Sequence, residues 1–318
     1  MSFLPYSSKE KEAQILSTLI KRISAIAIAL TAFFALAACS DDGIVEDTIS
    51  EESSGAAFSA VKKPSVPKAP SDLGIDASHV SDGYVFASAE NASRLKFQVT
   101  CGDMTYNYDL PNNGKATSYP VNMGDGEYSF RIMQNTEGNN YVELEREEAS
   151  VSLSSEQAPF LVPNMFCSYT GKSKCVSKAR ELVADSGDEG QALSTICSYV
   201  IDNIDYDTAK AVELSTTTGY VPNPDSTLAD GSGICFDYSS LAAAMLRSQG
   251  IPTQIVTGYV EPGNVYHAWT MVYINGTWKT VQFDVKSKTW SRVDTTFAST
   301  GGSSFVGDGT SYADRYIY

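Results

Sequence analysis

Residues Gly231 to Gly250 read Gly-Ser-Gly-Ile-Cys-Phe-Asp-Tyr-Ser-Ser-Leu-Ala-Ala-Ala-Met-Leu-Arg-Ser-Gln-Gly. The first glycines indicate a loop, apolar residues then recur at helical spacing, and Gly250 supplies a stop signal. Cys235 therefore lies where the loop becomes a helix. Unpaired backbone N–H groups and the positive end of the helix dipole favour a thiolate at that position. The stretch predicts the active-site helix of a cysteine enzyme.

A cysteine nucleophile needs an imidazole that takes and returns a proton, and a carboxylate that orients the imidazole. The chain has two histidines. His79 lies among serine and aspartate and is expected at the surface. His267 opens a predicted strand in the run Tyr266 to Trp269. If Cys235 is catalytic, His267 is its expected partner.

The segment before this region has a different pattern. From about Val80 to Leu153, short alternating runs are separated by turn clusters rich in Gly, Asn and Asp, which favours a small antiparallel β-sandwich. The predicted strands are 83–86, 95–99, 105–108, 127–132 and 141–144. Their function is not indicated by the sequence.

Helical periodicity begins near Ser173. It predicts one helix through Val183 and a second from Ala192 to Ile204, followed by a loop from Leu214 to Gly233. After the Cys235 helix, β-branched runs predict strands at 254–260, 266–274, 277–285 and 288–297, with an Asn-Gly hairpin turn at 275–276. Helices followed by an antiparallel sheet give an α+β domain.

Several motifs of the C-terminal half occur in the order found in the transglutaminase-like superfamily. They are Gly233-Ile234-Cys235-Phe236-Asp237-Tyr238, Gly250-Ile251-Pro252, Gly258-Tyr259, His267-Ala268-Trp269, and the run from Trp290 to Phe297. The chain resembles that superfamily over roughly residues 175–318. The resemblance implies a papain-like α+β fold with a Cys–His–Asp triad, and it leaves the reaction open among cross-linking, deamidation, peptide or amide hydrolysis, and loss of catalysis.

Two carboxylates compete for the third position of the triad. With a two-residue turn at Asn275-Gly276, His267 pairs with Asp284 on the next strand. The family pattern instead places aspartate four residues after a tryptophan. That position is Gln282 after Trp278 and Asp294 after Trp290. We favour Asp294 and retain Asp284 as its rival.

The N-terminal 38 residues resemble a bacterial lipoprotein signal peptide. Lys21 and Arg22 precede a short apolar run, and Leu36-Ala37-Ala38-Cys39 is similar to a lipobox. The resemblance implies cleavage before Cys39 and lipid attachment to its thiol, so that the protein is exported and faces outward from a cell membrane. The predicted organisation is signal peptide 1–38, acidic and proline-rich tether 39–75, β-sandwich-like domain 76–160 and catalytic domain 161–318.

The composition narrows the expected partners. Lysine plus arginine number 23 against 38 acids, a formal net charge of −15, which argues against nucleic acid as a partner. No spacing suggests a metal site, and no cofactor is expected. Cys101, Cys167, Cys175 and Cys197 form an even set that permits disulfides or free thiols. The oligomeric state is not indicated.

Together these patterns predict a surface-anchored cysteine enzyme that transfers acyl groups through a thioester. Hydrolysis is the preferred outcome because water is the abundant acceptor outside a cell. Extracellular proteins, peptides or cell-wall peptides are the expected substrates. Protein cross-linking and a non-catalytic binding module are the alternatives.

Overall fold

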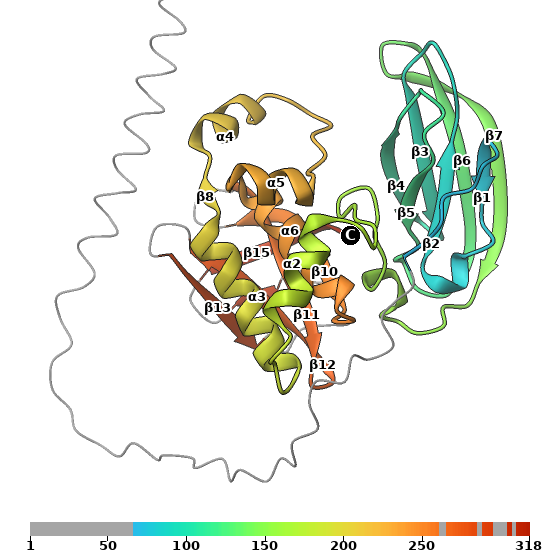
Figure 1. Cartoon of the computed structure of the whole chain (residues 1–318). Helices are drawn as coiled ribbons and strands as arrows, with labels where there is room; N and C mark the ends of the chain where they lie inside the picture. The colour runs from blue at the N-terminus through green and yellow to red at the C-terminus, as the bar shows by residue number, and fades with distance from the viewer. Residues whose placement is uncertain (1–65, 261–264, 285–287, 295–303, 307–309) are drawn as a thin grey trace, which may run out of the picture. The chain divides into compact units, whose positions relative to one another are not determined.

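The computed structural model describes residues 66–260, 265–284, 288–294, 304–306 and 310–318. All of them belong to one compact unit, Gly55–Tyr318. Antiparallel β-sheets come first in the chain, and helices and a second antiparallel assembly follow, so the predicted α+β class is confirmed (Figure 1). No helix in these ranges is long and apolar enough to cross a membrane.

The N-terminal β region forms two antiparallel sheets. Its elements are β1 (Gly74–Asp76), β2 (Tyr84–Ser88), β3 (Leu95–Cys101), β4 (Met104–Leu110), β5 (Thr117–Pro120), β6 (Gly126–Glu137) and β7 (Asn140–Val151), with single 3-10 turns at Val80–Asp82 and Ala158–Phe160. One sheet has the order β1-β2-β5 and the other β4-β3-β6-β7. All five predicted strands are present, and β1 and β5 complete the smaller sheet.

Alternation along the strands builds the core of this region. In β3, Leu95, Phe97 and Val99 are buried while the residues between them are partly exposed. The ring of Phe97 contacts that of Tyr119 at a centroid distance of 4.6 Å and lies parallel to that of Phe130 at 6.3 Å. These aromatic side chains bury large apolar areas, which is the main stabilising term for a small sandwich.

The predicted helices are confirmed as α2 (Lys174–Leu182), α3 (Glu189–Asn203) and α6 (Cys235–Ser248). The structure corrects the expected loop at 214–233, because helix α5 (Pro224–Asp230) lies within it; helix α4 (Thr208–Leu214), which no pattern predicted, precedes the loop. Side-chain caps explain where both helices begin. The Asp207 carboxylate accepts a hydrogen bond from the Lys210 N–H at 2.9 Å, and the Asn223 amide oxygen accepts one from the Ser226 N–H at 3.0 Å.

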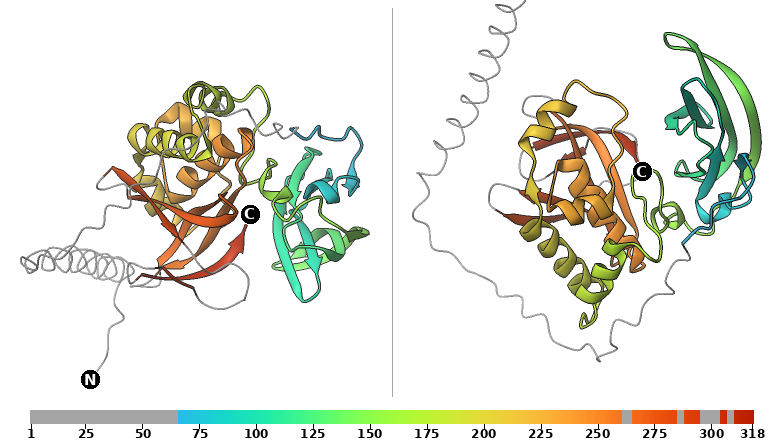
Figure 2. Two further views of the ribbon diagram at one scale, coloured as in Figure 1. Left: turned by 90° about the horizontal axis from the view of Figure 1, so that it is seen from below. Right: turned by 45° about the horizontal axis from the view of Figure 1, so that its top comes forward.

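The helices gather on one side of a six-stranded sheet, as Figures 1 and 2 show. Its strands are β10 (Thr253–Val260), β11 (Val265–Ile274), β12 (Thr277–Asp284), β13 (Thr289–Asp294), β14 (Ser304–Val306) and β15 (Thr310–Ile317). Their order is β13-β12-β11-β10-β15-β14, and every pair is antiparallel. Helix α6 contacts β10 and β11, so the start of α6 is held close to the strand that carries His267.

One hydrophobic cluster continues from the β region into the helices. Tyr106 and Tyr108 of β4 contact the ring of Tyr318, which in turn contacts that of Phe166 at 4.3 Å. The predicted division of the chain at residues 160 and 161 therefore crosses a shared core. The predicted signal peptide and most of the tether lie outside the described residues.

A buried arginine joins three segments of the C-terminal region. The Arg247 side chain is 0% exposed and donates hydrogen bonds to the backbone oxygens of Thr253, Val162 and Tyr318, each at 2.8 Å. These bonds hold the end of α6 to three segments: the start of β10, the segment before α2 and the residue that follows β15. Hydrogen bonds from a charged donor are stronger than those between neutral groups.

We predict that Arg247→Met lowers the free energy of unfolding by about 3 kcal/mol or more, because three buried carbonyl oxygens lose their donor. Arg180→Met on α2 is the matched control, since Arg180 is exposed. Denaturant unfolding followed by circular dichroism measures both variants. Equal stability of the two would show that the buried arginine does not hold the segments together.

Candidate active site

Backbone pairing fixes the turn that leads into Cys235. The two-residue strand β9 (Ser232–Gly233) lies parallel to β8 (Asp205–Tyr206). The Asp205 N–H donates to the Gly231 oxygen at 2.8 Å, and the Asp207 N–H donates to the Gly233 oxygen at 2.9 Å. The predicted loop is therefore held on both sides before α6 begins at Cys235.

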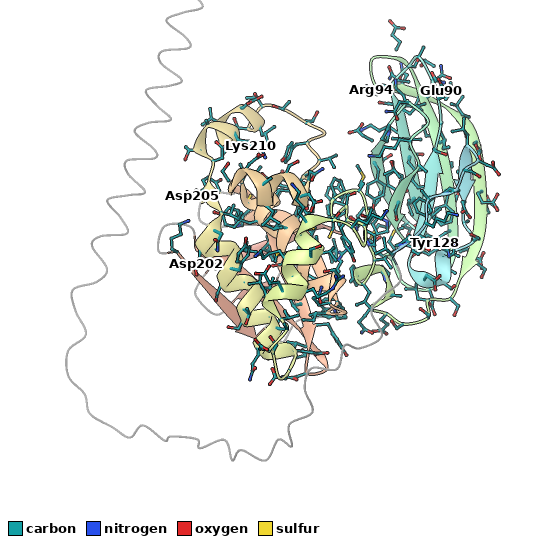
Figure 3. The ribbon with its side chains drawn as sticks, in the orientation of Figure 1. Glu90, Arg94, Tyr128, Asp202, Asp205 and Lys210 are labelled. Atoms are coloured by element: carbon teal, nitrogen blue, oxygen red, sulfur yellow. The ribbon has the colours of Figure 1, made fainter. Side chains whose placement is uncertain are left out.

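Asp237, on the first turn of α6, also stabilises the chain turn that leads into Cys235. Its carboxylate is 0% exposed and accepts hydrogen bonds from the Ile234 N–H at 2.8 Å, the Lys210 ammonium at 2.7 Å and the Tyr220 hydroxyl at 2.5 Å. Lys210 lies on α4 (Figure 3). A Cβ atom at Gly233 would lie 2.5 Å from Cβ of Asp237, so glycine is required there by close packing.

The partly buried Cys235 thiol lies beside the strand that carries His267. Burial raises its pKa, and this effect outweighs hydrogen bonding from the backbone N–H groups of Ala268 and Phe236, which favours the thiolate. The negative charge of Asp237 also raises the pKa of the thiol. The sequence predicted a lowered pKa from the helix N-terminus alone. That prediction is wrong in direction because it left out burial and the nearby carboxylate.

His267 lies on β11, opposite Gly258 of β10, and its ring lies nearly parallel to that of Trp269 at a centroid distance of 6.5 Å. The Ala268 N–H forms a hydrogen bond with the Cys235 sulfur. The structure therefore brings Cys235 close to the strand that carries His267, as the sequence predicted. Burial lowers the pKa of His267 below its usual 6.5. A raised thiol pKa and a lowered imidazole pKa leave both groups neutral at pH 7.

The pairing of the strands gives the two candidate carboxylates, Asp284 and Asp294, different positions in the sheet. The hairpin at 275–276 pairs Ile274 with Thr277 and continues to Thr270 opposite Val281. If this register is continued for three residues beyond the observed pairs, Asp284 comes opposite His267. Asp294 instead pairs with Lys279, whereas Asp284 pairs with Thr289. Lys279 and Asp284 are five positions apart on β12, about 17 Å along a strand.

Continued in this way, the register brings Asp284 to the level of His267, whereas Asp294 pairs with Lys279 and lies one strand further from β11. Strand β12, which carries Asp284, pairs directly with β11, whereas β13, which carries Asp294, pairs with β12. The side chains of Asp284 and Asp294 lie outside the described part of the structure.

Three residues near Cys235 had no role in the sequence analysis. Tyr206 is 40% exposed, and its pKa is raised by burial and, to a smaller extent, by the charge that Cys235 carries as a thiolate. Lys210 and Tyr220 bind Asp237, and the Lys210 ammonium lies 4.7 Å from the ring centroid of Tyr220. The cap signal of Asp207 would have placed Lys210 on a helix, but no local pattern links these side chains to Asp237.

The thiols in the part of the chain that the structure describes do not form disulfides. Within the described residues, Cys101, Cys167, Cys175, Cys197 and Cys235 are all free, which settles the alternative that the sequence left open. Burial raises the pKa of Cys167 to about 11. In the same ranges, no group of three or more His, Cys, Asp or Glu residues could hold a metal ion.

Comparison with known proteins gives a family match over part of the chain. Residues 176–295 match the profile of the transglutaminase-like superfamily. The match contains Cys235, His267 and both candidate carboxylates. No curated protein sequence matches the chain.

Matches among solved structures include three from different organisms. A protein from Cytophaga hutchinsonii, proposed to be a cysteine protease, is 14% identical, with 76% of this chain and 93% of that chain covered at a TM-score of 0.35. LapG from Legionella pneumophila, in its EGTA-treated form, is 16% identical over 37% of this chain and 61% of its own, with a TM-score of 0.28. A transglutaminase from red sea bream is 12% identical, with 62% of this chain and 47% of that chain covered at a TM-score of 0.27.

We predict that the His267 imidazole titrates with a midpoint below pH 6.5, because burial disfavours its charged form. Proton NMR of the imidazole C2–H signals measures this midpoint, and a His79→Gln variant assigns the two signals. A preformed thiolate–imidazolium pair would give the opposite result: a midpoint above 6.5 that falls when Cys235 is replaced by serine.

Proposed function

We propose that this protein is a cysteine enzyme that cleaves amide or peptide bonds through a thioester formed on Cys235. One observation carries the proposal: the thiol lies on the first residue of α6, beside the Ala268 N–H that follows His267. A nucleophile and a base on facing elements are the arrangement that acyl transfer requires.

In the proposed reaction, the Cys235 sulfur attacks the substrate carbonyl while its proton moves to the neutral His267 imidazole. The backbone N–H groups at the start of α6 can donate to the carbonyl oxygen as it gains negative charge. The C–N bond then breaks, and the imidazolium returns the proton to the leaving amine. A water molecule, deprotonated by His267, attacks the thioester, which releases the acid and restores the thiol.

We assign the orienting role to Asp284 in preference to Asp294. The register of β11, β12 and β13 supports this assignment, because its continuation by three residues would bring Asp284 opposite His267. A carboxylate in that place would fix the tautomer of the imidazole and stabilise its charged form during the reaction.

Hydrolysis is the outcome we favour, with cross-linking and a non-catalytic module as the alternatives. Cross-linking differs in its final step, since an amine replaces water as the acceptor of the acyl group. A non-catalytic module would keep the fold and an unreactive thiol. The test below separates the three by their products.

We further propose that the enzyme acts outside the cell while held at a membrane through lipid on Cys39, so that proteins, peptides or wall peptides near that surface are its substrates. The predicted lipobox supports this proposal. Detergent phase partitioning tests it: the natural chain is expected in the detergent phase and a Cys39→Ser variant in the aqueous phase. Equal partitioning of both would contradict it.

The enzymatic test uses a peptide library with and without an added fluorescent primary amine, analysed by mass spectrometry. Hydrolysis yields shorter peptides or acids in place of amides, and cross-linking yields amine adducts with loss of ammonia. Cys235→Ser is expected to abolish either product, and Asp284→Asn to lower kcat at least tenfold, because the imidazole loses its orienting charge.

Two controls make the test specific. Cys101→Ser removes another free thiol and is expected to leave turnover unchanged, and Asp294→Asn is expected to lower it less than twofold. Full activity in Asp284→Asn together with its loss in Asp294→Asn would reverse the assignment of the carboxylate. Absence of any product in the natural chain would favour the non-catalytic module.

A further inference from the structure

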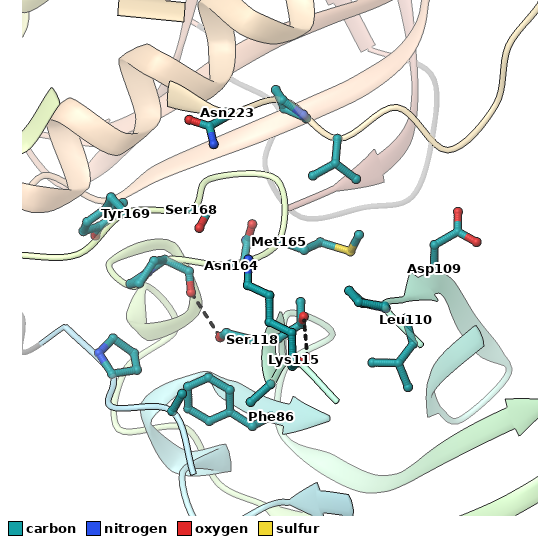
Figure 4. A pocket seen from close by; sticks show the side chains of 18 of the residues that line it. Phe86, Asp109, Leu110, Lys115, Ser118, Asn164, Met165, Ser168, Tyr169 and Asn223 are labelled. Carbon is teal, nitrogen blue, oxygen red and sulfur yellow. Dashed lines mark hydrogen bonds between the residues drawn. The ribbon is translucent and has the colours of Figure 1, made fainter. Parts of the chain in front are cut away.

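A pocket of about 710 Å³ lies next to the residues that support the Cys235 turn (Figure 4). It is lined by the β region, by the segment 163–170 and by the end of the loop before α5. Two of these segments continue directly into the candidate site. Tyr220 precedes the lining residue Val221 and binds Asp237, and Phe166 follows the lining residue Met165 and contacts the ring of Phe236 at 5.5 Å.

Asn164 presents an unpaired hydrogen-bond donor in this pocket. The residue is 2% exposed, and its side-chain nitrogen is buried and has no hydrogen-bond partner among the residues that the structure describes. Its side-chain oxygen accepts the Phe166 N–H at 2.9 Å, which fixes the orientation of the amide. Buried donors without a partner are rare in folded proteins, so this one calls for an acceptor that a ligand would supply.

Further donors lie around the same pocket. Lys115 is exposed, and its ammonium group has no ion pair among the described residues. The acidic lining residue Asp109 is already paired with Lys96 at 2.7 Å. The Asn223 side chain uses its oxygen to cap α5 and keeps its N–H groups for other partners. In a chain with a net charge of −15, this pocket combines an unpaired cation with amide donors.

Apolar side chains form the rest of the wall. Phe86, Leu110 and Met165 line the pocket and are each at least nine-tenths buried. A ligand that satisfies both parts of the pocket must carry oxygen acceptors with negative charge and an apolar group beside them. A peptide with a carboxylate next to an apolar side chain has this chemistry, and its amide carbonyls suit the asparagine donors.

We propose that this pocket binds a carboxylate-bearing peptide segment, with the carboxylate at Lys115 and Asn164 and an apolar side chain against Phe86 and Leu110. The inference rests on the proposed function, since the pocket would bind part of the peptide substrate through segments that continue into the candidate site. The carboxylate is either a peptide C-terminus or an acidic side chain.

The test measures binding to the full chain carrying Cys235→Ser, which prevents turnover of the probe. The probe is a rhodamine-labelled peptide with a leucine followed by a glutamate, read by fluorescence anisotropy. It is used as the C-terminal acid, as the C-terminal amide, and as the amide with glutamine in place of glutamate. We expect the last form to bind at least tenfold more weakly, and the first two forms to tell which carboxylate is recognised.

Two variants locate the binding site. Asn164→Asp keeps the acceptor for the Phe166 N–H but removes the donor and adds repulsion, so we expect at least a tenfold loss of affinity. Lys115→Met changes only an exposed side chain, so folding is not at risk, and we expect about a fivefold loss. Lys174→Met is the matched control: Lys174 is exposed and does not line the pocket, so affinity is expected to stay the same.

The outcomes separate this inference from the proposed function. Equal binding of the charged and neutral peptides, or unchanged binding in both pocket variants, overturns the inference even if the natural chain cleaves peptides. Binding that depends on Lys115 and Asn164 supports the inference even if the natural chain proves inactive, in which case the proposed function alone fails.

Discussion

The geometry around Cys235 depends on one buried carboxylate. A fully buried Asp237 is unfavourable without partners, and it has three: the Ile234 N–H, Lys210 and Tyr220. These bonds tie the first turn of α6 to α4 and to the loop before α5. They also explain Gly233, where any side chain would collide with Asp237. The position of the thiol is thus set by a polar contact that does not itself take part in the proposed reaction.

The same environment sets the protonation of the site. Burial favours the neutral form of both side chains, because it raises the pKa of Cys235 and lowers the pKa of His267. The backbone N–H groups near the sulfur favour the thiolate but do not overcome burial. The proton would therefore leave the sulfur during attack on the substrate. Binding that excludes water would strengthen the hydrogen bonds made to the developing charge.

The sequence was informative where a pattern is local. Periodicity located helices α2, α3 and α6 and most of the strands, namely β2 to β4, β6, β7 and β10 to β13, and the Asn-Gly pair at 275–276 fixed the register of the His267 hairpin. It failed for α4 and α5, whose starts depend on single capping residues within a polar segment. It also failed for the contacts of Asp237, since Lys210 is 27 positions away. The preference for Asp294 followed motif spacing, whereas the level of a residue in a sheet is set by strand pairing.

The most direct test of Cys235 as the nucleophile is intact-mass spectrometry of the protein, quenched in acid during turnover of a peptide identified from the library. The proposed mechanism predicts a mass increase equal to the acyl part of the substrate, located on the proteolytic fragment that contains Cys235 and absent when that residue is serine. Turnover that continues in the serine variant, or an acyl group found on another residue, would contradict the mechanism.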